Sequence, residues 1–118
     1  MLQIKSNLET VRWVEVQNLL KEAGLFVPEL EQIQKAFTHS YKICFLYEDE
    51  TLIGCGRAIS DGVYQAALYD IAILPKFQGR KLGKTIIEEL HKHLNGMNII
   101  LYASPGKEKF YEKMGYSS

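Results

Sequence analysis

The chain has 118 residues, in which 14 basic side chains balance 14 acidic ones. This length predicts a single domain that can bury one core without metals or disulfides. Zero net charge removes any general electrostatic argument for binding nucleic acid or an anionic membrane. With 47% hydrophobic residues, three prolines and nine glycines, the composition also excludes disordered, collagen-like and low-complexity classes.

The first residues, MLQIK, lack the apolar h-region of a signal peptide, and no later apolar run approaches the ~20 residues of a membrane span. We therefore expect a cytoplasmic protein. The two cysteines, Cys44 and Cys55, are too few for a disulfide framework and are expected to pack as reduced thiols. If the hairpin predicted around them turns symmetrically about Asp49 and Glu50, they lie opposite each other, and a disulfide can form under oxidative stress.

The first third of the chain predicts an edge strand over residues 2–5, followed by two helices. Asn7 or Thr10 is a candidate N-cap for the first helix, which ends at an Ala-Gly pair. Its apolar stripe consists of Val11, Val14, Leu19 and Leu20. Pro28 begins the second helical pattern, which ends near Ser40. The apolar positions of this second pattern are Leu30, Ile33 and Phe37.

From residue 41 onwards the pattern indicates β structure. Residues 41–47 and 52–59 are typical of the two strands of a hairpin. An Asp-Gly turn follows at residues 61–62, and then an apolar run over residues 63–74 that Pro75 ends.

A further helix follows the glycine-containing loop at residues 78–84, and its apolar face consists of Leu82, Ile86, Ile87, Leu90 and Leu94. Residues 97–103 predict a buried strand, residues 104–106 a turn, and residues 107–114 a short helix that Gly115 ends. The elements follow the order βααβββαβα, which predicts an α+β fold with a mixed sheet.

The loop after Pro75 is the first candidate site. A strand that ends at a proline, a loop with glycines and a helix start leave backbone N–H groups unpaired, and such a helix N-terminus binds anions. Arg80, Lys81 and Lys84 add positive charge, so a pyrophosphate group is the expected ligand. The loop matches neither the Walker pattern GxxxxGK[ST] nor GxGxxG. An ordinary strand-to-helix turn with solvated basic side chains is the alternative.

Two separated motifs carry a specific resemblance. Residues 73–83 read ILPKFQGRKLG, and residues 110–116 read FYEKMGY. They resemble the V-x-P-x-x-[QR]-x-x-G-x-[GA] and FY-x-K-x-GF elements of the GNAT superfamily of acetyl-CoA-dependent N-acetyltransferases. The order of the elements agrees over nearly the whole chain, so the resemblance implies the GNAT fold.

The sequence departs from the family pattern at two places. Lys81 stands where the family has its first motif glycine, and we expect it to adopt helical dihedral angles and to contribute its N–H group. The chain stops at Ser118, where the family usually adds a strand. A homodimer partner, a loop or a longer natural chain is then expected to cover the sheet edge.

The resemblance implies direct transfer of an acetyl group from acetyl-CoA to a bound amine, with no metal and no side-chain nucleophile. The pantetheine arm would lie along the strand edge and the pyrophosphate in the loop, while an N–H group near Ile73 polarises the thioester carbonyl. The implied cofactor-binding residues are Ile71, Ala72, Ile73, Gln78, Gly79, Arg80, Lys81, Leu82, Gly83, Lys84 and Ser104.

Proton transfer requires further groups, because an alkyl amine is mostly protonated at neutral pH and its deprotonation costs roughly 4 to 5 kcal/mol. Asp70 and Tyr69 are the polar residues of the central strand, and Asp70 is the better candidate base. A carboxylate paired within the sheet is the alternative for Asp70. Tyr111 matches the family's general acid for the departing thiolate, although such a tyrosine can also be half-buried packing.

The other polar residues are less informative. His91 and His93 diverge around their helix and His39 stands alone, so no metal site is predicted. Arg57 and Asp61 are expected either to face the acceptor or to pair with each other. Acceptor contacts are expected from Leu25, Phe26, Val27 and residues 60–64.

These observations favour an N-acetyltransferase for a small-molecule amine, with neither nucleic acid nor membrane as a partner. Acetylation of a protein N-terminus or lysine is one alternative. A non-catalytic acyl-CoA sensor and a generic nucleotide-binding module are two others.

Overall fold

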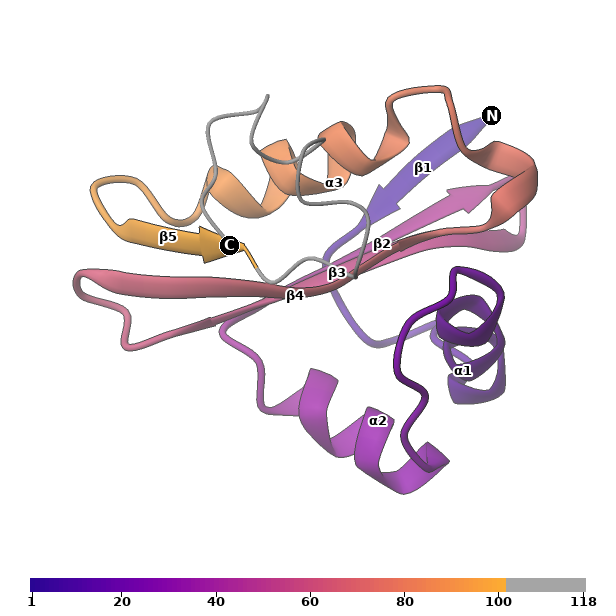
Figure 1. The fold of residues 1–118 in the computed structure, drawn as a ribbon, viewed down its shortest axis with the longest axis horizontal. Helices are drawn as coiled ribbons and strands as arrows, with labels where there is room; N and C mark the ends of the chain where they lie inside the picture. The colour runs from indigo at the N-terminus through magenta and orange to yellow at the C-terminus, as the bar shows by residue number, and fades with distance from the viewer. Residues whose placement is uncertain (102–118) are drawn as a thin grey trace.

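The computed structural model describes residues 1–101, and within them it confirms the predicted order βααβββαβ. The elements are β1 (Leu2–Lys5), α1 (Trp13–Glu22), α2 (Leu30–Thr38), β2 (Lys42–Glu48), β3 (Thr51–Ser60), β4 (Gln65–Ile73), the 3₁₀ turn η1 (Pro75–Phe77), α3 (Leu82–His91) and β5 (Asn98–Leu101). Helix α3 covers one face of the sheet, and α1 and α2 cover the other (Figure 1). The predicted strand end at residues 102–103, the turn 104–106 and the helix 107–114 lie outside the described residues.

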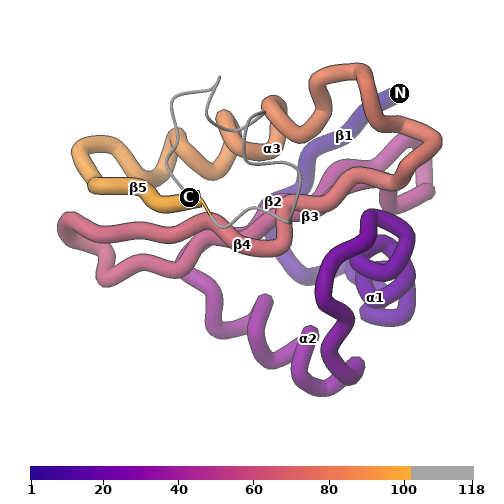
Figure 2. Tube along the Cα trace, viewed as in Figure 1, coloured from indigo at the N-terminus to yellow at the C-terminus, as the bar shows by residue number. Residues whose placement is uncertain are grey.

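The sheet is mixed, as the sequence predicts. Its strands follow the order β1-β2-β3-β4-β5; neighbours from β1 to β4 are antiparallel, whereas β4 and β5 are parallel. A parallel pair needs a long crossover connection, and Figure 2 shows the chain leaving β4, running through α3 and returning to β5. In this crossover the turn η1 and the short loop of residues 78–81 connect the end of β4 to the start of α3.

Two hydrophobic clusters hold the layers together. The cluster between α3 and the sheet includes Leu46, Ile53, Leu68, Ile86, Ile87 and Leu90. The cluster under α1 and α2 includes Val16, Leu19, Leu20, Ile33, Phe37 and Phe45. The central strands are therefore buried on both faces, which fits the near-continuous apolar runs of β2 and β4, whereas the edge strand β1 is mostly exposed.

Helix α1 begins later than the sequence suggests. Its N-cap is Arg12, without a side-chain cap, so the predicted capping by Asn7 or Thr10 is wrong. Val16 is fully buried, whereas Val14 is 64% exposed. Two residues correspond to about 200° of helix rotation, so Val14 lies on the side away from the core and does not belong to the buried stripe.

The hairpin of β2 and β3 is confirmed, but a bulge between Leu46 and Tyr47 shifts its register. Cys44 consequently lies opposite Gly56, and Cys44 and Cys55 belong to different core clusters on opposite faces of the sheet. The predicted opposition of the two cysteines, and with it the disulfide, is wrong, because one step of register reverses the face of a side chain. Burial raises the pKa of the Cys44 thiol to about 12.

Two glycines of β3 allow α3 to lie directly on the strand backbone. A Cβ atom on Gly54 would stand 2.8 Å from Ile73 Cδ1 and 2.9 Å from Ile86 Cδ1. A Cβ atom on Gly56 would stand 2.7 Å from Ile71 Cδ1 and 2.7 Å from Ile86 Cγ2. A methyl group at either position would require the neighbouring isoleucine side chains to shift, so these glycines allow α3 to pack close to the sheet.

Candidate functional site

Strand β4 has an edge that the described part of β5 does not pair. The parallel ladder joins Gln65–Leu68 to Asn98–Leu101, while β4 continues to Ile73. On that side, residues 70–73 have no strand partner among residues 1–101. The predicted edge at Ile71, Ala72 and Ile73 belongs to this segment, and backbone groups of such an edge can hydrogen-bond an extended ligand.

A second bulge lies within the same segment. Cys55 pairs with Ala72 but Arg57 pairs with Tyr69, so β4 has one residue more than β3 between these pairs. Asp70 occupies this stretch with a positive φ of 56°, a region that Asp tolerates better than most residues. Bulges next to a site re-aim side chains, and this one brings both Tyr69 and Asp70 to Arg57.

Arg57 forms an ion pair with Asp70, in which Nε donates to Oδ2 at 2.8 Å. The guanidinium carbon also lies 5.6 Å from the ring centroid of Tyr69. One of the two roles considered for Asp70, a carboxylate paired within the sheet, is therefore present in the structure. No spacing rule could have found this pair, because the partners belong to different strands and meet only through the bulge.

The predicted alternative pairing of Arg57 with Asp61 is wrong. Oδ1 of Asp61 accepts hydrogen bonds from the N–H groups of Val63, Tyr64 and Gln65 at 2.8, 2.9 and 3.2 Å. These backbone donors, that of Val63 foremost, hold the pKa of Asp61 below its ordinary value. Asp61 therefore closes the turn between β3 and β4, as its position in an Asp-Gly pair suggests.

The loop after β4 presents backbone donors to solvent. No residue of the described chain accepts a hydrogen bond from the N–H groups of residues 79–84, whereas Thr85 N–H donates to the carbonyl of Lys81. The N-cap of α3 is Lys81, with φ 61° and ψ 25°, so the expectation that it is an ordinary right-handed helical residue is wrong. Left-handed residues next to a helix start turn successive N–H groups toward one concave side, an arrangement that binds anions.

Basic side chains surround these donors. Arg80, Lys81 and Lys84 are exposed, and none of them forms an ion pair with another described residue. A Cβ atom on Gly79 or Gly83 would meet no heavy atom within 4 Å, so ligand atoms can approach the backbone there. The donor set fits a diphosphate group.

Gln78, one of the predicted cofactor-binding residues, contacts the end of β4. Its side-chain amide donates to the carbonyl of Ile73 at 3.0 Å. This bond ties the loop to the end of β4 and uses one of the acceptors on that strand end. In the described structure the Gln78 side chain therefore fixes the loop against the end of β4.

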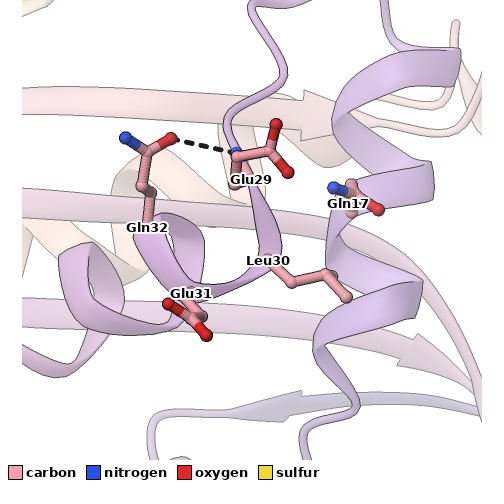
Figure 3. A pocket seen from close by; sticks show the side chains of 5 residues that line it. All are labelled: Gln17, Glu29, Leu30, Glu31 and Gln32. Atoms are coloured by element: carbon pink, nitrogen blue, oxygen red, sulfur yellow. Dashed lines mark hydrogen bonds between the residues drawn. The ribbon is translucent and has the colours of Figure 1, made fainter.

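A separate hollow lies between α1 and α2 and is lined by Gln17, Glu29, Leu30, Glu31 and Gln32 (Figure 3). Its polar groups serve the fold. Gln17 donates to the carbonyl of Pro28 at 3.2 Å, and the Gln32 side chain accepts from the Glu29 N–H at 3.0 Å, which is half of a capping box. The polar groups that line this hollow therefore cap the start of α2 and join it to α1, which is a structural role.

Two predicted site residues, Tyr111 and Ser104, lie outside the described residues. Among residues 1–101, no group of three or more His, Cys, Asp or Glu side chains could hold a metal ion. The described site therefore consists of the β4 edge with Tyr69 and Asp70, and the loop of residues 78–84 with its basic side chains.

Known proteins share this sequence pattern. Residues 39–118 match the family model described as an acetyltransferase (GNAT) domain. The chain is 32% identical over 118 residues to the uncharacterized N-acetyltransferase ycf52 of Porphyra purpurea, covering 94% of this chain and 68% of that protein. It is 33% identical over 96 residues to serotonin N-acetyltransferase 2, chloroplastic, of Oryza sativa subsp. japonica, covering 74% and 47%. It is 30% identical over 118 residues to histone acetyltransferase TAP1 of Glycine max, covering 88% and 51%.

Solved structures share the fold. A protein from meticillin-resistant Staphylococcus aureus superposes with a TM-score of 0.87 at 27% identity, covering 100% of this chain and 91% of that one. Glucosamine-6-phosphate N-acetyltransferase from Arabidopsis thaliana gives a TM-score of 0.70 at 19% identity, covering 100% and 92%. At that identity the likeness concerns the fold alone.

Proposed function

The chain belongs to the GNAT family of acetyltransferases, and from this premise we propose that it transfers the acetyl group of acetyl-CoA directly to the primary amine of a small molecule. One observation supports the cofactor most strongly. The backbone N–H groups of residues 79–84 have no acceptor among the described residues, and the basic side chains of the same loop form no ion pair with a described residue. A diphosphate needs such donors, and the open β4 edge beside them can hydrogen-bond an extended amide chain.

In this proposal the two halves of the site have different tasks. The cradle at residues 79–84, with Arg80, Lys81 and Lys84, holds the pyrophosphate, and Ser104 adds a polar contact. The β4 edge at residues 71–73 aligns the pantetheine arm. Fixed backbone donors cost no reorganisation during the reaction, so an N–H group near Ile73 can stabilise the negative charge that develops on the thioester oxygen.

Three side chains handle protons in the same proposal. Asp70, assisted by Tyr69, receives a proton from the acceptor ammonium, and the resulting amine attacks the thioester carbon. Tyr111 gives a proton to the departing sulfur. Positioned proton transfer of this kind contributes typically 10²- to 10⁴-fold to a rate.

Calorimetry with coenzyme A tests the cradle. We expect binding that weakens when Arg80 and Lys84 are both replaced by Ala, because each substitution removes a charge-assisted hydrogen bond to a phosphate oxygen. Lys21→Ala and Lys35→Ala together are the matched control, since these exposed lysines lie on α1 and α2, on the other face of the sheet. Absence of heat with coenzyme A, or competition by ATP as strong as that by coenzyme A, would contradict the proposal.

Tyr111→Phe separates an enzyme from an acyl-CoA sensor. We expect the variant to bind acetyl-CoA like the wild type and to lose turnover by at least about tenfold, because it removes only the hydroxyl. Unchanged turnover would remove Tyr111 from the mechanism.

The acceptor is the second question, because the rice relative is named for serotonin and the soybean relative for histones. The chain covers about half of each of these proteins. We propose the small-molecule class, and a protein acceptor is the second candidate. Turnover on a panel of arylalkylamines, alkyl polyamines and amino sugars, compared with peptides that carry a free N-terminus or lysine, distinguishes the two. Faster acetylation of the peptides would overturn the small-molecule choice.

The compartment also stays a proposal. Among residues 1–101, no helix has the length and apolarity that crossing a membrane requires. The rice relative is named as chloroplastic, so a cytoplasmic location is one of two compartments that a fluorescent fusion to the intact chain can distinguish.

A further inference from the structure

The ion pair at the β4 bulge engages only one oxygen of Asp70. Arg57 Nε donates to Oδ2, and no residue of the described chain hydrogen-bonds to Oδ1. The Asp70 side chain keeps 27% of its surface exposed, so the carboxylate is both held and accessible. A second donor can therefore reach it without breaking the ion pair.

The Arg57 side chain is held in place by contacts with α2, with the residue Ser40 that follows α2, and with β4. Its guanidinium carbon lies 5.7 Å from the ring centroid of Phe37 and 5.6 Å from that of Tyr69. Nη1 donates to Ser40 Oγ at 3.3 Å, and the Ser40 hydroxyl donates to the carbonyl of Ala36 at 2.7 Å. Only 16% of the Arg57 side chain is exposed.

These contacts connect two elements that the sequence alone leaves unrelated. Phe37 belongs to α2 and Ser40 follows its C-terminus, whereas Tyr69 and Asp70 belong to β4. Planar guanidinium groups suit such a place, because they stack on aromatic faces while directing N–H groups at a carboxylate in fixed directions.

We propose that Arg57 is a positioning residue: it holds Oδ2 of Asp70 so that Oδ1 faces the acceptor ammonium beside the β4 edge. This inference rests on the proposed acetyl transfer and goes beyond it, since it assigns a role to a side chain of β3 and to its anchor on α2. Asp70 directly precedes the edge residues 71–73, along which the thioester arm is expected.

The proposed step is balanced in atoms and charge. The acceptor ammonium gives one proton to Asp70 Oδ1, and the free amine forms a C–N bond at the thioester carbon. The C–S bond then breaks, and the departing thiolate takes up the second proton that the nitrogen loses. One hydrogen stays on the amide product, and the neutral Asp70 carboxyl afterwards releases its proton to water. Arg57 takes part in none of these transfers and acts only by holding the carboxylate.

A double-mutant cycle tests this role. The four proteins are the wild type, Arg57→Met, Asp70→Asn and the double variant, assayed with acetyl-CoA and the amine of the panel that the wild type acetylates fastest. We expect each single variant to lower kcat between about tenfold and a hundredfold, because a misplaced group can cost that much. We expect the double variant to equal Asp70→Asn, since Arg57 acts through Asp70 alone. The KM for acetyl-CoA should change by less than about twofold.

A merely structural role predicts other results. The kcat losses would then add in the double variant, or kcat would recover in Arg57→Met once the folded fraction is restored by cooling. Either result, or wild-type kcat in Arg57→Met or in Asp70→Asn, overturns the inference. Arg57→Lys and Ser40→Ala, which keep the charge or loosen one anchor, should give intermediate kcat values and serve if Arg57→Met does not fold. Lys42→Met is the matched control, because Lys42 also lies over an aromatic ring, at 5.4 Å from the Tyr41 centroid, but on β2.

Failure of the proposed function looks different. A wild-type protein that binds no coenzyme A or acetylates no amine removes the reaction itself, and the inference with it. A wild-type enzyme that turns over while the cycle is additive removes only the role of Arg57.

Discussion

Lys81 illustrates how a single residue can occupy a loop position against its own backbone preference. It lies in the left-handed region at φ 61°, where a side chain other than Gly or Asn costs about 1 to 2 kcal/mol. The neighbouring Gly79, at φ 85°, has no such cost. The family pattern places a glycine where this chain has Lys81, and the structure shows why glycine fits that position.

Lys81→Gly is therefore expected to raise the free energy of unfolding by up to about 1 kcal/mol, since relief of the strain exceeds the extra chain entropy of glycine by a small margin. The same variant should weaken binding of coenzyme A, because it removes one charge of the cradle. Denaturant titration and calorimetry measure the two effects. Lys84→Gly, inside α3, is the control and should lower stability by about 1 kcal/mol. Equal losses of stability in both variants would contradict the strain at Lys81.

Cys44 gives a second prediction, on pH. The thiol ionises near 9.0 when exposed, but burial raises the pKa of the folded group to about 12. A raised folded pKa stabilises the folded state fully below the unfolded pKa, and the contribution is lost as pH rises from 9.0 toward about 12. Denaturant midpoints of the wild type should therefore fall more steeply above about pH 9 than those of Cys44→Ala. Parallel curves for the two proteins would contradict the burial of this thiol.

At the scale of elements, glycines in β3 set how closely α3 approaches the sheet. Gly56→Ala places a methyl group 2.7 Å from Ile71 Cδ1 and Ile86 Cγ2. We expect it to lower the free energy of unfolding by about 1 to 3 kcal/mol, the usual cost of overpacking. Gly83→Ala is the matched control, because its Cβ would meet nothing within 4 Å and alanine favours a helix by up to about 1 kcal/mol. The midpoint temperature of thermal unfolding should fall in Gly56→Ala and rise in Gly83→Ala. A Gly56→Ala protein as stable as the wild type would contradict the close packing.

The elements themselves could be predicted because their signals are local. Alternation, turn residues such as the pair at 61–62 and the spacing of apolar residues on α3 are all read within a few positions. The features that escaped prediction depend on pairing across strands. The bulge at Leu46 and Tyr47 separates the cysteines, and the bulge at Asp70 brings it to Arg57.

In the candidate site, too, features with local signals could be predicted, whereas features that depend on pairing across strands could not. The N–H groups of residues 79–84 that lack an acceptor among the described residues could be predicted, because a helix start after a proline-ended strand exposes such groups whatever the rest of the fold does. That they bind an anion stays a prediction. The partner of Asp70 could not, since Arg57 reaches it from another strand. The left-handed state of Lys81 likewise follows from how the loop joins α3, which residue preferences do not reveal.

At the scale of the whole molecule, the net charge is zero, yet positive charge is concentrated in one segment. Lys76, Arg80, Lys81 and Lys84 lie within one short segment, and none has an acidic partner among residues 1–101. We therefore expect the Kd for coenzyme A to rise severalfold as salt increases from about 0.05 to 0.5 M, because screening shortens the Debye length from roughly 14 to 4 Å. The double variant of Arg80 and Lys84 should show a shallower dependence. An affinity independent of salt would contradict an electrostatic cradle.

The sheet also raises the question of assembly. Within the described chain, β1 and β5 form the two edges of the sheet, and a homodimer that covers one of them stays a prediction. Sedimentation equilibrium at several protein concentrations distinguishes a particle of 13.5 kDa from one of twice that mass.

Gly54 and Gly56 of β3 also bear on the geometry of the proposed site. Helix α3 starts at the phosphate end of the proposed site, and Gly54 faces Ile73, at the thioester end. The close contact between α3 and β3 that these glycines allow therefore contributes to the distance between the two ends. On the proposed function, this distance limits the length of a ligand that can contact both ends at once. A ligand with a shorter or longer arm between its diphosphate and its acyl group would then contact either the start of α3 or the end of β4, but not both.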